Sequence, residues 1–444
     1  MMLHRALLAL VTFAMAVAVQ GSAFLAAATD EPASGATLLP TQSFWKAPDG
    51  EVVAAFAAEP DGGVAIVTFD RAVANYVFYR IDRDGGTLWR RQFGEGYKAE
   101  WEADKALLGE NLALTGWDIV RLAGDMQGGL LACDAWNALR RIDATGSIVW
   151  EEKSAITSFA EGNETYSVGC EQFAILADGS TVIASSPTRD KRLEIHIRRL
   201  DPGGNLAWAT YVPAGEDAGE VKTIVALPDG NIEILFDPLE PERRTFSGSP
   251  RSQLARQWRI SPEGVWVPQT EMERRMPPLP YQELFDYWTR MPTQWTPLAQ
   301  RQLPPGSYWF EVEALYRSGD RLVRAGLGSV GPGCGFSLEE WSIDGARLVR
   351  RYELAAPLPR DRNWYGERLR YLGQSGERDI LTLHCYNAEP FIVAIGNDRS
   401  AQWYRADRLF DAAQATLSTG GERFYLLASP AEILSAEIPR DGTN

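Results

Sequence analysis

Few side chains in this 444-residue sequence are suited to acid–base or nucleophilic chemistry. Histidine is the usual base of a catalytic triad, and the chain has only His4, His196 and His384. His4 stands in an apolar N-terminal segment, and His384 follows an apolar run that indicates a structural role. His196 alternates with Glu194 and Arg198, so we expect it to be exposed on a polar strand face. The sequence therefore predicts no catalytic residues and no histidine-rich metal site.

The carboxylates are numerous but point to no particular reaction. Aspartate and glutamate number 59, and a pair of them could serve glycoside chemistry, yet no spacing singles one out. Asp82-x-Asp84-Gly85 matches the start of a calcium loop but lacks its later ligands, so it predicts a hairpin turn. We predict no cofactor, and calcium stays open as an alternative. The formal net charge of -15 argues against a nucleic-acid partner, which needs a basic surface.

A strand–turn–strand pattern recurs along the chain and would position these groups. In its clearest copy Asp82 opens the turn, glycine follows, and Trp89 lies in the next strand. The aspartates of the first three copies, Asp82, Asp143 and Asp201, are separated by 61 and 58 residues. Three strong copies are followed by three weaker ones, at residues 79–89, 141–150, 199–208, 259–266, 341–348 and 392–403.

A second hairpin precedes each of these six copies, and a seventh follows the last copy. Its turns carry glycine, mostly with aspartate or other small polar residues, as tight hairpins require. They lie at residues 60–62, 126–129, 177–179, 228–230, 318–320, 375–376 and 419–421. Two hairpins make four antiparallel strands, and a four-stranded repeat of this period is typical of a propeller blade. The sequence predicts an all-β propeller of about seven four-stranded antiparallel blades, with six or eight still open.

The two ends of the chain are expected to meet in one blade. Residues 435–439 read as the third strand of the last blade, and the chain ends soon afterwards. Residues 37–45, before the first blade, would then supply its fourth strand. Such an N-terminal strand closes the ring and removes a free sheet edge.

Tryptophan and cysteine recur at matching repeat positions. Trp89, Trp150, Trp208 and Trp266 share one position, which favours packing between neighbouring blades over a ligand cage. No two cysteines have metal-finger spacing. Four cysteines allow three disulfide connectivities, and placement in successive repeats favours one of them. We predict the disulfides Cys133–Cys170 and Cys334–Cys385.

The Asp-x-x-Gly-x-x-x-Trp pattern of these copies resembles the PQQ-like (quinoprotein-like) propeller repeats of exported bacterial proteins. That resemblance implies a propeller fold. It is weak for function, because the family includes quinone-dependent dehydrogenases as well as non-enzymatic periplasmic scaffolds. The enzymes often use adjacent cysteines near the cofactor, which this chain lacks, so a scaffold is favoured and PQQ stays open.

The N-terminus reads as a secretory signal peptide. A short polar start precedes an apolar run from Ala6 to Val19, and small residues follow that fit cleavage after Ala23 or Ala28. We assign residues 1–28 to the signal and residues 29–444 to a single propeller domain. The expected location is periplasmic or secreted, with no transmembrane span after cleavage.

Loop lengths point to one functional face. The turns within hairpins are short, whereas the long segments all fall between blades or between the second and third strands. The most distinctive is a proline- and aromatic-rich insert at residues 268–305. The candidate binding residues lie in this insert and in two other loops: Tyr281, Phe285, Tyr287, Trp288, Trp295, Arg243, Arg244, Trp364 and Tyr365.

We therefore predict a non-catalytic binding or protein-interaction scaffold, whose partner is a protein or another component of the cell envelope. The alternative is a propeller enzyme with its site at the mouth of the channel. Its chemistry would be that of a carbohydrate-active hydrolase or lyase, or of a quinone- or calcium-dependent oxidoreductase.

Overall fold

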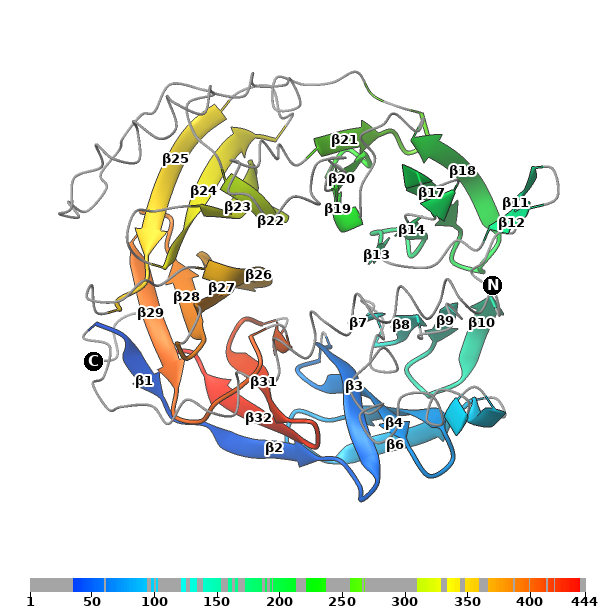
Figure 1. Cartoon of the computed structure of the whole chain (residues 1–444), viewed down its shortest axis with the longest axis horizontal. Coiled ribbons are helices and arrows are strands. Elements are labelled where there is room, and N and C mark those ends of the chain that lie inside the picture. Colours follow the sequence, from blue (N-terminus) through cyan, green and yellow to red (C-terminus); the bar gives the residue numbers. More distant parts are fainter. Residues whose placement is uncertain are drawn as a thin grey trace.

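The computed structural model is a ring of seven antiparallel sheets around a central channel (Figure 1). The innermost strands β3, β7, β13, β19, β22, β26 and β30 contact one another in this order, and β30 contacts β3 again. This closed cycle settles the blade number at seven. The structure describes residues 35–59, 61–93, 97–99, 101–102, 121–124, 128–133, 139–152, 159–161, 164–166, 172–185, 188–189, 192–193, 195–212, 221–236, 256–265, 267, 310–328, 334–343, 348–358, 366–385, 388–398, 400–412, 414–418 and 420–439.

Within each blade the strands run outward from the channel in chain order. Blade 1 contains β3 (Glu51–Ala58), β4 (Val64–Asp70), β5 (Asn75–Ile81) and β6 (Thr87–Gln92). Blade 2 contains β7 (Arg121–Gly124), β8 (Leu130–Cys133), β9 (Leu139–Ile142) and β10 (Ile148–Glu152). Blade 3 contains β13 (Gln172–Ile175), β14 (Thr181–Ser185), β17 (Ile195–Leu200) and β18 (Leu206–Val212), and blade 4 contains β19 (Val221–Ala226), β20 (Ile232–Phe236) and β21 (Arg256–Ile260). Blade 5 contains β22 (Phe310–Ser318), β23 (Arg321–Gly328), β24 (Gly335–Ser342) and β25 (Leu348–Ala355). Blade 6 contains β26 (Gly366–Ser375), β27 (Arg378–Cys385), β28 (Phe391–Ile395) and β29 (Ala401–Ala406). Blade 7 contains β30 (Ala415–Leu417), β31 (Arg423–Ser429) and β32 (Glu432–Glu437).

Two short hairpins sit in the links of blade 3. One joins β11 (Phe159–Glu161) to β12 (Glu164–Tyr166), and the other joins β15 (Thr188–Arg189) to β16 (Arg192–Leu193). Residues 98–99 and 101–102, in the link from blade 1 to blade 2, are helical. No helix in the described part of the chain is long and apolar enough to cross a membrane.

The N-terminal segment closes the ring, as predicted. Strand β2 (Gln42–Lys46) pairs antiparallel with β32 and becomes the outermost strand of blade 7. The sequence did not predict the place of strand β1 (Thr37–Leu39), which pairs in parallel with β29 at the outer edge of blade 6. Leu39 is buried there at 1 % exposure. The segment therefore ties blade 6 to blade 7 before the first blade begins.

Both faces of each blade are buried, and this explains the nearly continuous apolar strands. In β5 every residue is buried, and alternate side chains face opposite neighbours. Val77 and Tyr79 pack with residues of blade 7, whereas Tyr76 and Phe78 pack with residues of blade 2. A strand between two packed sheets has no solvent face, so burial does not alternate along it.

Candidate functional site

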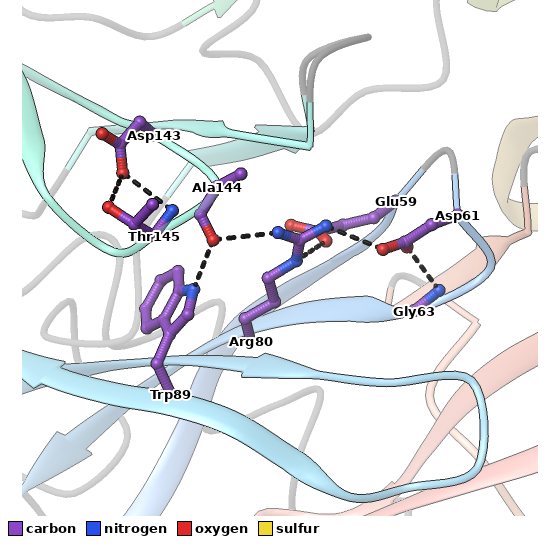
Figure 2. Close-up of polar contacts among 8 residues, drawn as sticks. All are labelled: Glu59, Asp61, Gly63, Arg80, Trp89, Asp143, Ala144 and Thr145. Carbon is purple, nitrogen blue, oxygen red and sulfur yellow. Dashed lines mark hydrogen bonds and ion pairs between the residues drawn. The ribbon is translucent and has the colours of Figure 1, made fainter.

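The face that carries the hairpin turns is locked by contacts between blades (Figure 2). Arg80, at 8 % exposure, reaches from blade 1 to the next blade, where its Nη1 donates to the carbonyl of Ala144 at 3.0 Å. Its Nε lies 2.6 Å from the carboxylate of Glu59, which is fully buried, and its Nη2 lies 2.7 Å from Asp61. Trp89 Nε1 donates to the same Ala144 carbonyl at 3.1 Å. One turn of blade 2 is thus held by an arginine and a tryptophan of blade 1.

The same contact recurs around most of the ring. Arginine side chains donate to a backbone carbonyl of the following blade at five further interfaces: Arg141 to Gly179 and Pro202, Arg199 to Pro262, Arg259 to Ile343, Arg378 to Pro439, and Arg423 to Arg83. Trp150 and Trp208 repeat the role of Trp89, donating to Pro202 and Pro262 respectively. The predicted packing of this tryptophan position between blades is confirmed for these three residues, and Trp266 lies outside the described residues.

The aspartate of each turn organises the turn itself. Asp143 Oδ1 accepts hydrogen bonds from the backbone of Thr145 at 2.8 Å and of Ser147 at 3.0 Å. Gly146 in this turn has a φ of 82°, and a Cβ there would lie 3.0 Å from the ring of Trp89. Glycine is therefore required both by the backbone conformation and by the close approach of the neighbouring blade. Asp82 makes the same bonds to Asp84 and Gly86, so this motif is a hairpin turn as predicted.

The interface between blades 5 and 6 carries a disulfide. Cys334 and Cys385 are bonded with a Cα–Cα distance of 5.8 Å, which confirms that predicted pair. Cys334 directly precedes β24, the third strand of blade 5, and Cys385 ends β27, the second strand of blade 6. Tyr316 and Tyr371 stack across this interface with centroids 3.7 Å apart. Cys133 is also disulfide-bonded, and its predicted partner Cys170 lies outside the described residues.

A second cluster of polar side chains surrounds the buried carboxylate of Glu51 in blade 1. Tyr79 donates to the carboxylate of Glu51 at 2.8 Å, and Thr68 also bonds this carboxylate. Arg90 lies 3.0 Å from Glu51 and donates to the Tyr79 hydroxyl at 2.9 Å. Burial, opposed by the Arg90 hydrogen bond and supported by Glu51, raises the pKa of Tyr79 to about 12. The phenol therefore stays protonated at neutral pH and serves as a donor inside blade 1.

His196 is buried at 1 % exposure, so the prediction of an exposed imidazole is wrong. The polar alternation of Glu194, His196 and Arg198 was read as a solvent-facing side, but β17 is an interior strand whose two faces both pack against neighbouring blades. Burial, with the nearby charge of Arg198, lowers the pKa of His196 to about 4. This histidine is neutral at physiological pH.

Because strands alternate in direction, all links between blades emerge at the face opposite the hairpin turns. Arg121, the first residue of β7, and Arg368 and Arg370 of β26 lie at the link side and are exposed. Strand β26 has 10 residues and the adjacent β30 has 3, and the segment before β30 continues along blade 6, where Thr382 donates to the carbonyl of Ala412 at 3.1 Å.

The binding residues predicted from the long loops lie outside the described residues. These are Tyr281, Phe285, Tyr287, Trp288, Trp295, Arg243, Arg244, Trp364 and Tyr365. The structure does bring other groups together that sequence reasoning missed, above all Arg80 and its counterparts. Their signal was present, because an arginine stands two positions before the turn-opening residue in Arg80-Ile81-Asp82 and in the next three copies. Within the described ranges, no group of three or more His, Cys, Asp or Glu residues could hold a metal ion.

No protein-family model matches this chain, and no curated protein matches it either. Solved structures with similar folds include a streptogramin B lyase, at 12 % identity and a TM-score of 0.46, covering 90 % of this chain and 97 % of the lyase. BamB from Moraxella catarrhalis has 9 % identity and a TM-score of 0.40, covering 87 % of this chain and 85 % of BamB. BBS1N, crystallised in complex with ARL6DN, has 8 % identity and a TM-score of 0.48, covering 91 % of this chain and 98 % of that one. These are unlike proteins, so the similarities add no function to the propeller fold.

Proposed function

We propose that this chain is an exported, non-catalytic scaffold that binds a protein or another envelope component through its link-bearing face. The observation that supports the proposal is that one face of the ring carries contacts between blades, whereas the other carries the connections between them. The hairpin-turn face is occupied by contacts that hold the blades together, such as Arg80 to Ala144 and Trp89 to Ala144. The opposite face receives the connections between blades, and the sequence position of the long insert at residues 268–305 favours the same face. Variable loops on a rigid ring are the usual place for recognition.

Export is supported by the disulfides, because such bonds persist in oxidising compartments. The Cys334–Cys385 bond joins two blades and is buried, with both cysteines at 1 % exposure or less. N-terminal sequencing of protein recovered from the periplasm should find chains that begin at residue 24 or 29. Recovery of the chain beginning at Met1 from the cytosol would contradict export.

Site-specific photo-crosslinking in the producing cells tests the binding face. A benzoylphenylalanine replaces Tyr287 or Tyr365, which the sequence analysis assigns to long loops, with matched positions at Leu88 or Leu206 on the outermost strands. Leu88 and Leu206 are 54 % and 62 % exposed, so the probe is tolerated there. We expect a discrete adduct from Tyr287 or Tyr365 and none from the leucine positions. Adducts only at Leu88 or Leu206, or none anywhere, would overturn the proposal.

A thermal-shift screen separates the scaffold from an enzyme. A ligand at 100 times its dissociation constant stabilises the folded state by about 2.7 kcal/mol, which is readily visible. The scaffold proposal predicts no shift with calcium, PQQ or neutral oligosaccharides. A clear shift with any of these would favour the enzyme and direct attention to the channel.

A further inference from the structure

We propose that the Cys334–Cys385 disulfide is a redox-dependent joint of the ring. With the bond formed, blades 5 and 6 stay closed against each other. With both cysteines reduced, the ring opens first between these two blades. Such a joint goes beyond the proposed binding role and would act whatever partner the propeller binds.

Blade 5 differs from the other six blades in how it is joined to its successor. At the other six interfaces an arginine donates to a backbone carbonyl of the following blade. In blades 1 to 4 this arginine stands two positions before the turn-opening residue, and in blades 6 and 7 it begins the second strand. In blade 5 the first of these positions holds Ser342, which has no guanidinium group. The second holds Arg321, which pairs with Asp320 of its own turn at 3.5 Å.

The tryptophan of the repeat is missing from blade 5 as well. Trp89, Trp150 and Trp208 donate to the same turn carbonyls as the arginines of blades 1 to 3. Residues 344–355, which include the fourth strand of blade 5, contain no tryptophan. The disulfide therefore joins the pair of blades whose repeat positions supply neither donor.

The bond lies at the end of the interface opposite the hairpin turns. Cys334 directly precedes β24 and Cys385 ends β27, so both stand where links between second and third strands emerge. Their backbone carbonyls accept hydrogen bonds from Ala356 at 2.8 Å and from Ala388 at 3.0 Å, which lie in neighbouring links. Loss of the bond would therefore loosen the link-bearing face, which we propose for binding.

The contacts that remain without the bond are weaker than the bond itself. At the turn-side end, Ser318 of blade 5 donates to the buried carboxylate of Asp379 in blade 6 at 2.9 Å. In the middle, Tyr316 stacks on Tyr371. Apolar clusters fill this interface and the others alike. One hydrogen bond and one ring pair contribute less than a cross-link across 51 residues, so this interface becomes the weakest when the bond is lost.

Reduction of the joint is a two-electron exchange with a dithiol. A thiolate of the dithiol attacks one sulfur, the S–S bond breaks, both cysteines end as thiols and the dithiol ends as a disulfide. Cys334 and Cys385 are at 1 % exposure or less, so the exchange takes place during folding or while the interface is open. The closed ring is therefore favoured in an oxidising compartment, in keeping with the proposed export.

Native-state hydrogen exchange with mass spectrometry tests the proposal on the purified mature propeller. In the double variant Cys334→Ala/Cys385→Ala, we expect amides of blades 5 and 6 to exchange at least about tenfold faster, and those of blades 3 and 4 less than about twofold faster. The matched control is Arg199→Met, which removes the arginine contact between blades 3 and 4 and should give the reverse distribution.

A third variant tests whether the bond replaces the arginine. Adding Ser342→Arg to the double variant should slow exchange in blades 5 and 6 again. The acceptor would be the carbonyl of Asn397, because the turn bond from Gly396 to Ser400 matches that from Asp143 to Ser147. Asn397 thus corresponds to Ala144, the acceptor in blade 2. No slowing would overturn the claim that the bond replaces this contact.

Unchanged protection of blades 5 and 6 in the double variant overturns the proposal. Equal acceleration in all blades overturns it too, because the bond would then stabilise the whole ring without defining a joint. Circular dichroism shows whether each variant is folded, and Cys334→Val/Cys385→Ala, which keeps more of the side-chain volume, serves if the first does not fold. The measurement needs no partner, so its failure leaves the crosslinking result for the scaffold intact, and the reverse also holds.

Discussion

Replacing Arg80 by methionine should destabilise the propeller far more than the same change at Arg199. Both arginines donate to a turn carbonyl of the next blade, at 3.0 and 2.9 Å. They differ in the carboxylate they leave behind. The Glu59 side chain is fully buried, whereas the Asp178 side chain beside Arg199 is 55 % exposed and can be hydrated.

The expected magnitudes follow from that difference. Removing one partner of a buried ion pair costs about 3 to 5 kcal/mol, so Arg80→Met should lower the free energy of unfolding by that amount. Arg199→Met loses a hydrogen bond and a largely exposed ion pair, and should cost about 1 to 2 kcal/mol. Adding Glu59→Gln to Arg80→Met should recover about 1 to 2 kcal/mol, because the buried charge is then gone.

Urea unfolding followed by tryptophan fluorescence measures these differences through the transition midpoint. Equal losses in Arg80→Met and Arg199→Met, to within about 0.5 kcal/mol, would refute the argument from burial. A further loss on adding Glu59→Gln would refute it as well, because the carboxylate would then be stabilising without its arginine.

Three other outcomes follow from the described contacts. The pKa of His196 is lowered to about 4 from 6.5 in the unfolded chain, so the free energy of unfolding is at its full value above about pH 6.5 and falls by about 3 kcal/mol on the way to pH 4. His196→Gln should flatten this part of the pH profile of urea midpoints. An unchanged slope in the variant would argue against a neutral, buried His196. Replacing Cys334 and Cys385 together by alanine should cost about 4 kcal/mol by the chain-entropy model, because the bond spans 51 residues, and a loss below about 1 kcal/mol would show that the bond constrains little. Leu39→Ala, at a 1 % exposed position of β1, should lower the free energy of unfolding by about 2 to 5 kcal/mol. Leu38→Ala, at 55 % exposure, should change it by no more than about 0.5 kcal/mol. Similar thermal shifts in the two variants would mean that β1 does not hold blade 6.

Local sequence rules predicted the turns well. Asp143 bonds the backbone of residues two and four positions later, and Gly146 has the positive φ that such a turn needs. Both requirements are satisfied within a few residues, so they leave a readable pattern. The strand repeat, the ring closure by β2 and the Cys334–Cys385 pair followed from the same periodicity.

The errors arose where two blades meet. His196 looked exposed because polar residues alternate around it, and that reading assumes one solvent face per strand. Packing on both faces buries it, as it buries Arg80 and Glu59. The arginine that precedes each turn was visible in the sequence, but its contact could not be predicted from it, because the acceptor carbonyl lies more than fifty residues away in most blades. Arg80 and Ala144, for instance, are 64 positions apart.

By itself, the sequence determined an all-β propeller repeat of about seven blades, because hairpin turns and strand periodicity are local properties of the chain; the closed ring of innermost strands then set the number at seven. Only the tertiary structure decided which charges are buried, which carbonyl each arginine reaches, and that β1 joins blade 6 while β2 joins blade 7. These features depend on the angle and distance between sheets, which closing the ring sets and which no single repeat encodes.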